Sequence, residues 1–428
     1  LFIVADDLGW ADVGWHSSNI KTPTRDRLVK EGVELDQHYV QPVCTPTRTA
    51  LMSGRYPGRF GPHALVPSNL RSLPLGTPTL ASLLKSAGYQ TAIAGKWHLG
   101  SRTEWGPNHY GFDQSYGSLA GAVDPWTHQY RSGPFAKSWH RNGELFDEEG
   151  NATELVSAQI VKWIGQTRKH WFIYVPFHAV HIPIDTPPQF KQLYEGIVFH
   201  DDAVKNESAM RYAAFVSQMD AKIGEFVEAL DKSGQRGNTL IVFTSDNGGL
   251  NSGANPYIGS VKPTPALGGN LPLRGIKGQL YEGGIRVPAF VNWPAKLAPR
   301  KSAALMHAVD WLPTLASVAA YALPQDVALD GMNMWPALSD EQFKPAPRSL
   351  YWPYTAGKAV RVGDWKLISH KSKQKSRSEL FNLADDPYEK NDLAGKNPER
   401  LAELQARLAD FEKGDVKSIP ADLKEHRP

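Results

Sequence analysis

The chain has 428 residues, of which 41% are hydrophobic and 21% are charged. This length exceeds what one compact core usually holds and favours a large domain with a smaller one. The net charge is only +3, from 47 basic and 44 acidic residues. The overall charge is therefore too balanced to indicate binding to nucleic acid or to a membrane surface. We expect no membrane span, because no apolar run is long enough. One cysteine, Cys44, cannot form an internal disulfide.

Short apolar runs ending in polar residues recur along the first 250 residues. They span 1–5, 89–94, 171–175 and 239–244, and helical patterns lie between them near 80–84 and 215–230. This alternation predicts an α/β fold with a large, mostly parallel sheet flanked by helices. Such sheets bind ligands beyond the carboxyl ends of their strands, so the polar residues after each run should converge on one edge.

The remaining segments have other patterns. Two stretches rich in glycine and aromatic residues, 100–151 and 248–284, predict loops that shape the pocket. After about Pro336, strand patterns at 349–352, 359–361 and 365–369 precede a charged helix over 398–413. We therefore divide the chain into a catalytic domain, 1–336, and a C-terminal subdomain, 337–428, with a small antiparallel sheet. The basic run 370–377 is interpreted as a solvated hairpin loop.

The single cysteine opens a Cys-x-Pro-x-Arg pentapeptide that ends at Arg48. Pro46 suits the first turn of a helix and Gly54 suits its end, which places Cys44 just before a helix N-terminus. Backbone N–H groups at that position favour negative charge. The alternative interpretation is a buried structural cysteine.

Three carboxylates follow two of the predicted strands. Asp6 and Asp7 come after the first run, and Asp246 comes with Asn247 after the last one. Such a cluster would repel strongly unless a cation or raised pKa values relieved it. Oxygen ligands alone favour calcium or magnesium over zinc. Turn formation could explain each pair separately, but it does not explain both together.

Several blocks resemble, in the same order, those of the type I sulfatases, the formylglycine-dependent members of the alkaline phosphatase superfamily. The blocks are the pentapeptide, Asp6–Gly9, Gly95–Gly100, Ser245–Gly249, Arg274–Gly278 and Glu379–Pro387. The resemblance implies that Cys44 is converted to formylglycine, whose hydrated aldehyde is the nucleophile. It also implies a calcium ion, with magnesium the less favoured alternative, held by Asp6, Asp7, Cys44, Asp246 and Asn247.

The basic residues fit the same chemistry. A sulfuryl group in flight spreads negative charge over its oxygens, so cations around it stabilise the transition state. By resemblance, Lys96 and Lys277 hold the sulfate, and Arg48 braces the formylglycine. His181 protonates the departing alcohol, while His98 takes a proton from the second hydroxyl of the nucleophile. His178 is interpreted as a satisfied core or surface residue.

The substrate is expected to be a sulfated carbohydrate, from a glycosaminoglycan or an algal polysaccharide. The loop at 111–128 resembles the branch that contains N-acetylgalactosamine 4-sulfatase, which makes Asp124, Trp126 and His128 candidate substrate contacts. A formylglycine-generating or anaerobic sulfatase-maturating enzyme is the implied partner. Residue 1 is Leu within an apolar run, so the natural start is expected to lie upstream. The family favours a periplasmic or secreted location.

Two alternatives remain open at this point. One is a phosphonate or phosphate ester hydrolase of the same superfamily, because some of its members share the pentapeptide. The other is a non-catalytic carbohydrate-binding relative, for which loss of Cys44, His181 or a metal carboxylate would be expected; none of these residues is lost.

Overall fold

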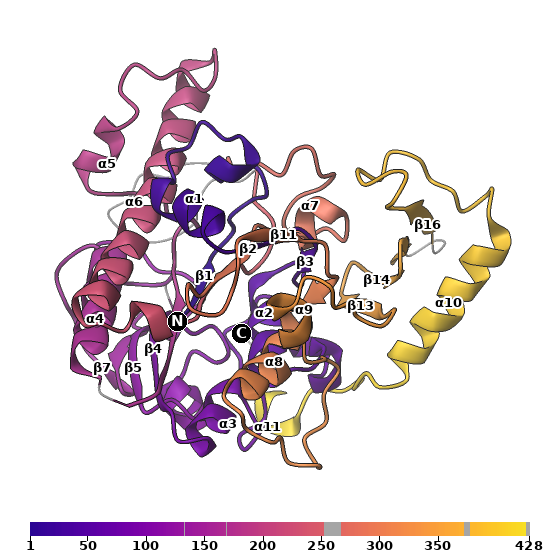
Figure 1. The fold of residues 1–428 in the computed structure, drawn as a ribbon, viewed down its shortest axis with the longest axis horizontal. Helices are drawn as coiled ribbons and strands as arrows, with labels where there is room; N and C mark the ends of the chain where they lie inside the picture. The colour runs from indigo at the N-terminus through magenta and orange to yellow at the C-terminus, as the bar shows by residue number, and fades with distance from the viewer. Residues whose placement is uncertain (132, 168, 252–266, 372–376, 425–428) are drawn as a thin grey trace.

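The computed structural model describes residues 1–131, 133–167, 169–251, 267–371 and 377–424. Its largest element is a mixed sheet of order β11-β2-β10-β9-β1-β8-β4-β5-β6-β7 (Figure 1). The strands are β1 (Phe2–Ala5), β2 (Val33–Leu35), β4 (Gln90–Lys96), β5 (Gln114–Ser118), β6 (Trp139–Arg141), β7 (Glu144–Leu145), β8 (Trp171–Pro176), β9 (Ile241–Ser245), β10 (Phe290–Asn292) and β11 (Arg300–Ser302). The central strands β9, β1, β8, β4 and β5 run parallel, whereas β10 and β6 pair antiparallel with their inner neighbours.

Helices cover both faces of this sheet. The α-helices are α1 (Pro23–Lys30), α2 (Cys44–Ser53), α3 (Leu80–Ser86), α4 (Ala152–Gln166), α5 (Pro188–Gln192), α6 (Ala203–Lys232), α7 (Glu282–Ile285), α8 (Trp311–Val318), α9 (Trp335–Ser339), α10 (Pro398–Glu412) and α11 (Ala421–Lys424). The 3-10 helices are η1 (Gly14–His16), η2 (Pro57–Phe60), η3 (Pro62–Leu65), η4 (Thr103–Trp105), η5 (Pro107–Tyr110), η6 (Arg236–Asn238) and η7 (Ala308–Asp310). In β1, Ile3 and Ala5 pack in the core that holds α4 and α6, while Phe2 and Val4 pack in the core that holds α3 and α8. Burial on both faces explains why the central strands are apolar without alternation.

A second, four-stranded antiparallel sheet forms near the C-terminus. It consists of β13 (Ser349–Tyr354), β14 (Gly357–Val362), β15 (Trp365–His370) and β16 (Arg377–Asn382) in that order. One face carries α10 through Leu404 and Leu408. Trp352, on the other face, packs in a core with Tyr39 and Ile285 of the large unit. These two sheets confirm the predicted fold class, whereas the boundary placed after residue 336 stays a prediction.

The prediction of a simple loop over 100–151 is wrong in part. Strands β5, β6 and β7 all lie within this segment and extend the main sheet at one edge. The β5 sequence, Gln-Ser-Tyr-Gly-Ser, has no apolar run, so tertiary pairing rather than local pattern forms this strand. Residues 252–266 of the second predicted loop and 372–376 of the basic run lie outside the described residues.

A short parallel pair, β3 (His38–Tyr39) with β12 (Met306–His307), lies beside the main sheet. In the described part of the chain, every helix falls short of the length or the apolar character that crossing a bilayer requires.

Candidate functional site

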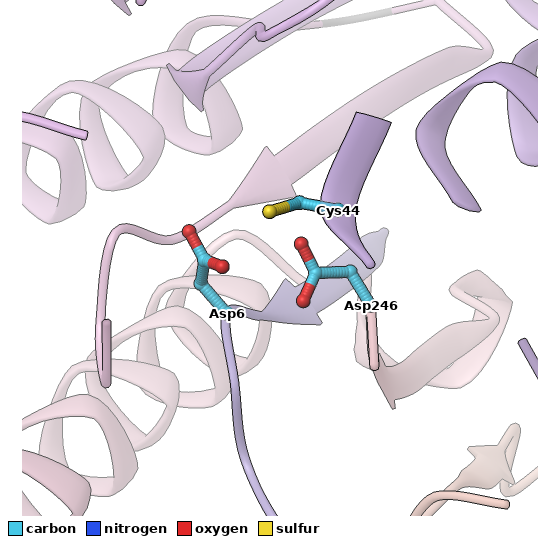
Figure 2. Close-up of side chains that lie close together, drawn as sticks. All are labelled: Asp6, Cys44 and Asp246. Atoms are coloured by element: carbon cyan, nitrogen blue, oxygen red, sulfur yellow. The ribbon is translucent and has the colours of Figure 1, made fainter. Parts of the chain in front are cut away.

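Three carboxylates meet at the carboxyl edge of the main sheet. Asp6 and Asp7 follow β1, and Asp246 follows the adjacent parallel strand β9. The pairing of Ala5 with Ser245 places the two strand ends side by side. One ligand atom each of Asp6, Asp246 and Cys44 lie within 4.8 Å of one another, and Figure 2 shows the thiol directed toward both carboxylates.

The oxygens of this cluster fit a hard divalent cation. Asp6 Oδ1 and Asn247 Oδ1 are buried and accept no hydrogen bond from the described residues. Burial and the neighbouring charge of Asp6 raise the pKa of Asp246 to about 6. Unsatisfied buried oxygens and crowded carboxylates are costly unless something positive binds them. Carboxylate and amide oxygens are the ligands that calcium and magnesium prefer.

Cys44 is the first residue of α2, within one residue of its predicted place before the helix. Every residue of α2 is buried, and Gly54 ends the helix in the left-handed region, with φ of 66°. Burial raises the pKa of the Cys44 thiol, although Lys277 and Lys96 oppose this effect. An unmodified thiol here is therefore mostly protonated and a weak nucleophile.

Three cationic side chains surround the carboxylates. Lys96 Nζ donates to Asp6 Oδ2 at 2.5 Å, and Arg48 Nη2 donates to Asp246 Oδ2 at 2.8 Å. Lys277 Nζ lies 2.6 Å from Asp7 Oδ1 and 2.8 Å from Asp7 Oδ2.

The pKa of Asp7 reflects this pairing. Burial acts to raise it, but the charge of Lys277 and the hydrogen bonds from Lys277 and Asn247 hold it below its usual range. The cluster thus combines buried negative groups with positive groups that can meet an anionic substrate.

Two histidines complete the polar lining. His181 Nε2 lies 3.8 Å from Asp7 Oδ2, and burial followed by Lys277 lowers the pKa of His181 to about 3. Burial and the charge of Lys96 hold the pKa of His98 well below its usual value. Both rings are therefore neutral in this structure near pH 7.

The ring of His98 is confined by Gly121. A Cβ atom at residue 121 would lie only 2.2 Å from His98 Nε2. His98 itself has a left-handed backbone, with φ of 57°. Such a backbone is costly for a residue with a side chain, and it persists only where the surroundings hold it.

The structure brings ten of the sequence-predicted residues into one cluster. They are Asp6, Asp7, Cys44, Arg48, Lys96, His98, His181, Asp246, Asn247 and Lys277. They come from segments as far apart as β1 and the loop before α7.

Each of the three candidate substrate contacts already has a partner within the protein. Asp124 is buried, and its Oδ1 accepts hydrogen bonds from the backbone N–H groups of Trp126 and Thr127. Trp126 Nε1 donates to Asp185 Oδ2 at 3.0 Å, and His128 stacks on the Trp139 ring. These contacts build the loop, and a substrate role for Asp124, Trp126 and His128 stays a prediction.

Sequence reasoning missed Gly121 and the position of Ser118, whereas the interpretation of His178 as a satisfied residue agrees with its burial and its hydrogen bond. Ser118 Oγ lies 2.7 Å from His178 Nε2, and His178 lines a small cavity together with His181. The pairing of Lys96 with Ser118 in β4 and β5 brings this serine to the site. No local sequence signal marks that register, because β5 lacks an apolar pattern.

Comparison with known proteins gives consistent matches over the whole chain. The model of a family described as Sulfatase matches residues 1–321, and a second, described as N-sulphoglucosamine sulphohydrolase, C-terminal, matches residues 276–413. Mouse Arylsulfatase J is 34% identical over 97% of this chain and 76% of its own length. Human N-acetylgalactosamine-6-sulfatase is 30% identical over 82% of this chain and 67% of its own length. A crystal structure of Ps i-CgsB in complex with k-i-k-neocarrahexaose is similar with a TM-score of 0.85 and 30% identity, covering 99% of this chain and 95% of that one.

Proposed function

The chain belongs to the sulfatase family of sulfuric ester hydrolases, and on this premise we propose that the cluster around Cys44 removes sulfate from a carbohydrate ester. The observation that carries the proposal is the position of Cys44 at the start of a buried helix, with its thiol within 4.8 Å of oxygens of both Asp6 and Asp246. A nucleophile, a cation site and several basic groups then meet at one point, as transfer of an anionic group requires.

The reacting group is proposed to be formylglycine made from Cys44 by a maturating enzyme. The raised pKa of the buried thiol supports this proposal, since the unmodified residue would supply little thiolate. Calcium would be held by Asp6, Asp7, Asp246 and Asn247, where it would polarise the sulfate and neutralise developing charge. The buried unpaired oxygens of Asp6 and Asn247 support this ligand set.

The basic side chains are proposed to act on the sulfate and on the protons. Lys96 and Lys277 would hold the sulfate oxygens, and Arg48 would orient the nucleophile. His181 would protonate the leaving alcohol, and His98 would take a proton from the nucleophile's second hydroxyl. Burial, followed by the charge of Lys277, lowers the pKa of His181 to about 3, and the negative charge of a bound sulfate would act to raise it.

The carbohydrate part of the proposal is supported by what related proteins act on. One relative is named N-acetylgalactosamine-6-sulfatase, and the similar crystal structure holds k-i-k-neocarrahexaose. Both are 30% identical to this chain. A periplasmic or secreted site of action, where sulfated polysaccharides are met, accords with such a substrate.

The proposal is tested by comparing ester classes on the matured protein. The chain is produced together with a formylglycine-generating enzyme, and turnover of 4-nitrophenyl sulfate is compared with that of 4-nitrophenyl phosphate. We expect sulfate hydrolysis to dominate and to disappear in Cys44→Ala, which should keep the fold. Faster phosphate hydrolysis, or unchanged turnover in Cys44→Ala, would end the proposal.

A further inference from the structure

One strand of the C-terminal sheet runs alongside the segment that leads to Cys44. Trp352 Nε1, in β13, donates to the Val40 carbonyl at 2.8 Å, and Gln41 Nε2 donates to the Tyr351 carbonyl at 3.4 Å. Both contacts are buried. The last residue of β13, Tyr354, is therefore held close to the approach to the site.

The hydroxyl of Tyr354 lies over the backbone that follows Lys277. A Cβ atom built at Gly278 would lie 3.6 Å from Tyr354 Oη, and among the described residues no other atom would come within 4 Å of it apart from the chain neighbours of Gly278. Gly278 N donates to the Pro42 carbonyl at 2.8 Å, which ties this backbone to the residues just before Cys44. Tyr354 thus borders the site on the side of Lys277.

This hydroxyl has no hydrogen-bond partner among the described residues. Nearby tyrosines differ, because Tyr281 donates to Glu379 at 2.5 Å and Tyr351 donates to Asp415 at 2.6 Å. Tyr354 is half-buried, and its ring packs against the apolar core between the two sheets. The Tyr354 ring is therefore fixed by packing, while its hydroxyl can form a hydrogen bond with a ligand.

Electrostatics supports the same placement. Burial raises the pKa of Tyr354, and the charge of Lys277 opposes this effect. The phenol consequently stays protonated near pH 7 and can donate a hydrogen bond. Lys277 already supplies a positive charge on this side of the site for the sulfate. The neutral Tyr354 hydroxyl is therefore suited to donate to an uncharged oxygen of the substrate next to the sulfate.

We propose that Tyr354 is a specificity residue that donates a hydrogen bond to the sugar bearing the sulfate. A fixed aromatic ring with a free hydroxyl combines an apolar face with a donor, as carbohydrate recognition requires. The inference deepens the proposed function and rests on it. It also gives the C-terminal sheet a direct part in choosing the substrate.

The test is Tyr354→Phe, which removes one oxygen and keeps the packed ring. The matured enzyme is assayed on a sulfated carrageenan oligosaccharide and on 4-nitrophenyl sulfate, which lacks a sugar. We expect the ratio of kcat/KM for the oligosaccharide to that for the aryl ester to fall about three- to tenfold, mainly through KM, as loss of one neutral hydrogen bond predicts. An unchanged thermal midpoint would show that the fold is intact.

A matched control is Tyr89→Phe. Tyr89 is also half-buried, but it precedes the first residue of β4, and the site residue Lys96 is the last residue of that strand. Tyr89→Phe should therefore leave the ratio unchanged. An unaltered ratio in Tyr354→Phe, or equal losses on both esters, would overturn the inference while the proposed function stood. A wild-type enzyme inactive on both esters would instead overturn the proposed function, and the inference with it.

Discussion

Two of the buried clusters of charge in the described part of the chain differ in whether each oxygen has a donor or a cation of the protein beside it. In the active-site cluster, Asp6 Oδ1 and Asn247 Oδ1 accept nothing from the described residues. In the second cluster, Lys366 Nζ lies 2.8 Å from a carboxylate oxygen of Glu282 and 2.8 Å from one of Glu389. The difference indicates which cluster awaits a ligand and which one is structural.

The second cluster, formed by Lys366, Glu282 and Glu389, connects the C-terminal sheet to the large unit. Lys366 belongs to β15, Glu282 begins α7, and Glu389 follows β16. The other Glu282 oxygen accepts from Tyr39 at 2.6 Å, and the other Glu389 oxygen accepts from the Glu282 N–H at 2.7 Å. Glu389 Oε1 accepts no hydrogen bond but faces the Lys366 ammonium, so each of the four carboxylate oxygens has a donor or a cation of the protein beside it. This cluster should therefore govern stability, whereas the first should govern cation binding and catalysis.

Asp6→Asn should break the active-site cluster with the largest effect. The amide cannot supply the anionic oxygen that the proposed cation requires, so activity should fall by about a thousandfold or more, equivalent to about 4 kcal/mol. Added calcium should also no longer raise the thermal midpoint, since ligand binding stabilises only a protein that binds it. The exposed Asp364→Asn is the control. A calcium-dependent shift that survived in Asp6→Asn would show that the ion binds elsewhere.

Lys366→Met should break the second cluster instead. It leaves two buried carboxylates without their cation, which should lower the free energy of unfolding by about 3–5 kcal/mol in urea titrations. Lys301→Met is the matched control, because Lys301 also contacts two carboxylates but its side chain is 56% exposed. That change should cost less than about 1 kcal/mol. Equal losses of unfolding free energy in the two variants would show that the buried cluster contributes no more to stability than the exposed one.

Gly121→Ala should move one proposed catalytic side chain without changing a charge. The new methyl group would displace the His98 ring, and a shift of this kind should reduce kcat about a hundredfold. Gly165→Ala in α4 is the control, since among the described residues no atom outside the helix's own neighbouring backbone lies within 4 Å of its Cβ position, and the change should be neutral or stabilising. Wild-type kcat in Gly121→Ala would mean that His98 is not held where the reaction needs it.

The second cluster should also make stability depend on pH. Burial, together with the charge of Glu282, raises the pKa of Glu389 from 4.5 to about 7, although Lys366 opposes the shift. Between these values the folded state binds more protons than the unfolded state, so stability falls as pH rises. The free energy of unfolding should therefore drop from about pH 5 to about pH 8 in the wild type relative to Glu389→Gln. Parallel profiles for the two proteins would contradict the raised pKa.

The two clusters were not equally predictable from sequence. The active-site carboxylates follow apolar runs, so local pattern places them at strand ends, and the resemblance to sulfatases supplies their roles. The contacts of Lys366 with Glu282 and Glu389 join three separate elements, and no local signal marks them. The same holds for Gly121, whose close approach to His98 depends on tertiary packing.

Secondary structure shows the same limit. The C-terminal helix is confirmed almost to the residue, because its apolar positions recur at helical spacing. Helix α6 begins at Ala203, well before the predicted stripe at 215, since its first turns are mostly exposed and carry few apolar residues. Local periodicity detects the buried parts of elements and misses those that lie in solvent.

The most direct test of the account is the release of free sulfate from a sulfated oligosaccharide by matured protein. Peptide mass should first show residue 44 lighter than cysteine by about 18 Da, as conversion to formylglycine requires. Ion chromatography should then detect inorganic sulfate in amounts that grow with time and vanish when calcium is chelated. Converted protein that releases no sulfate from any sulfated sugar or aryl ester would contradict the account.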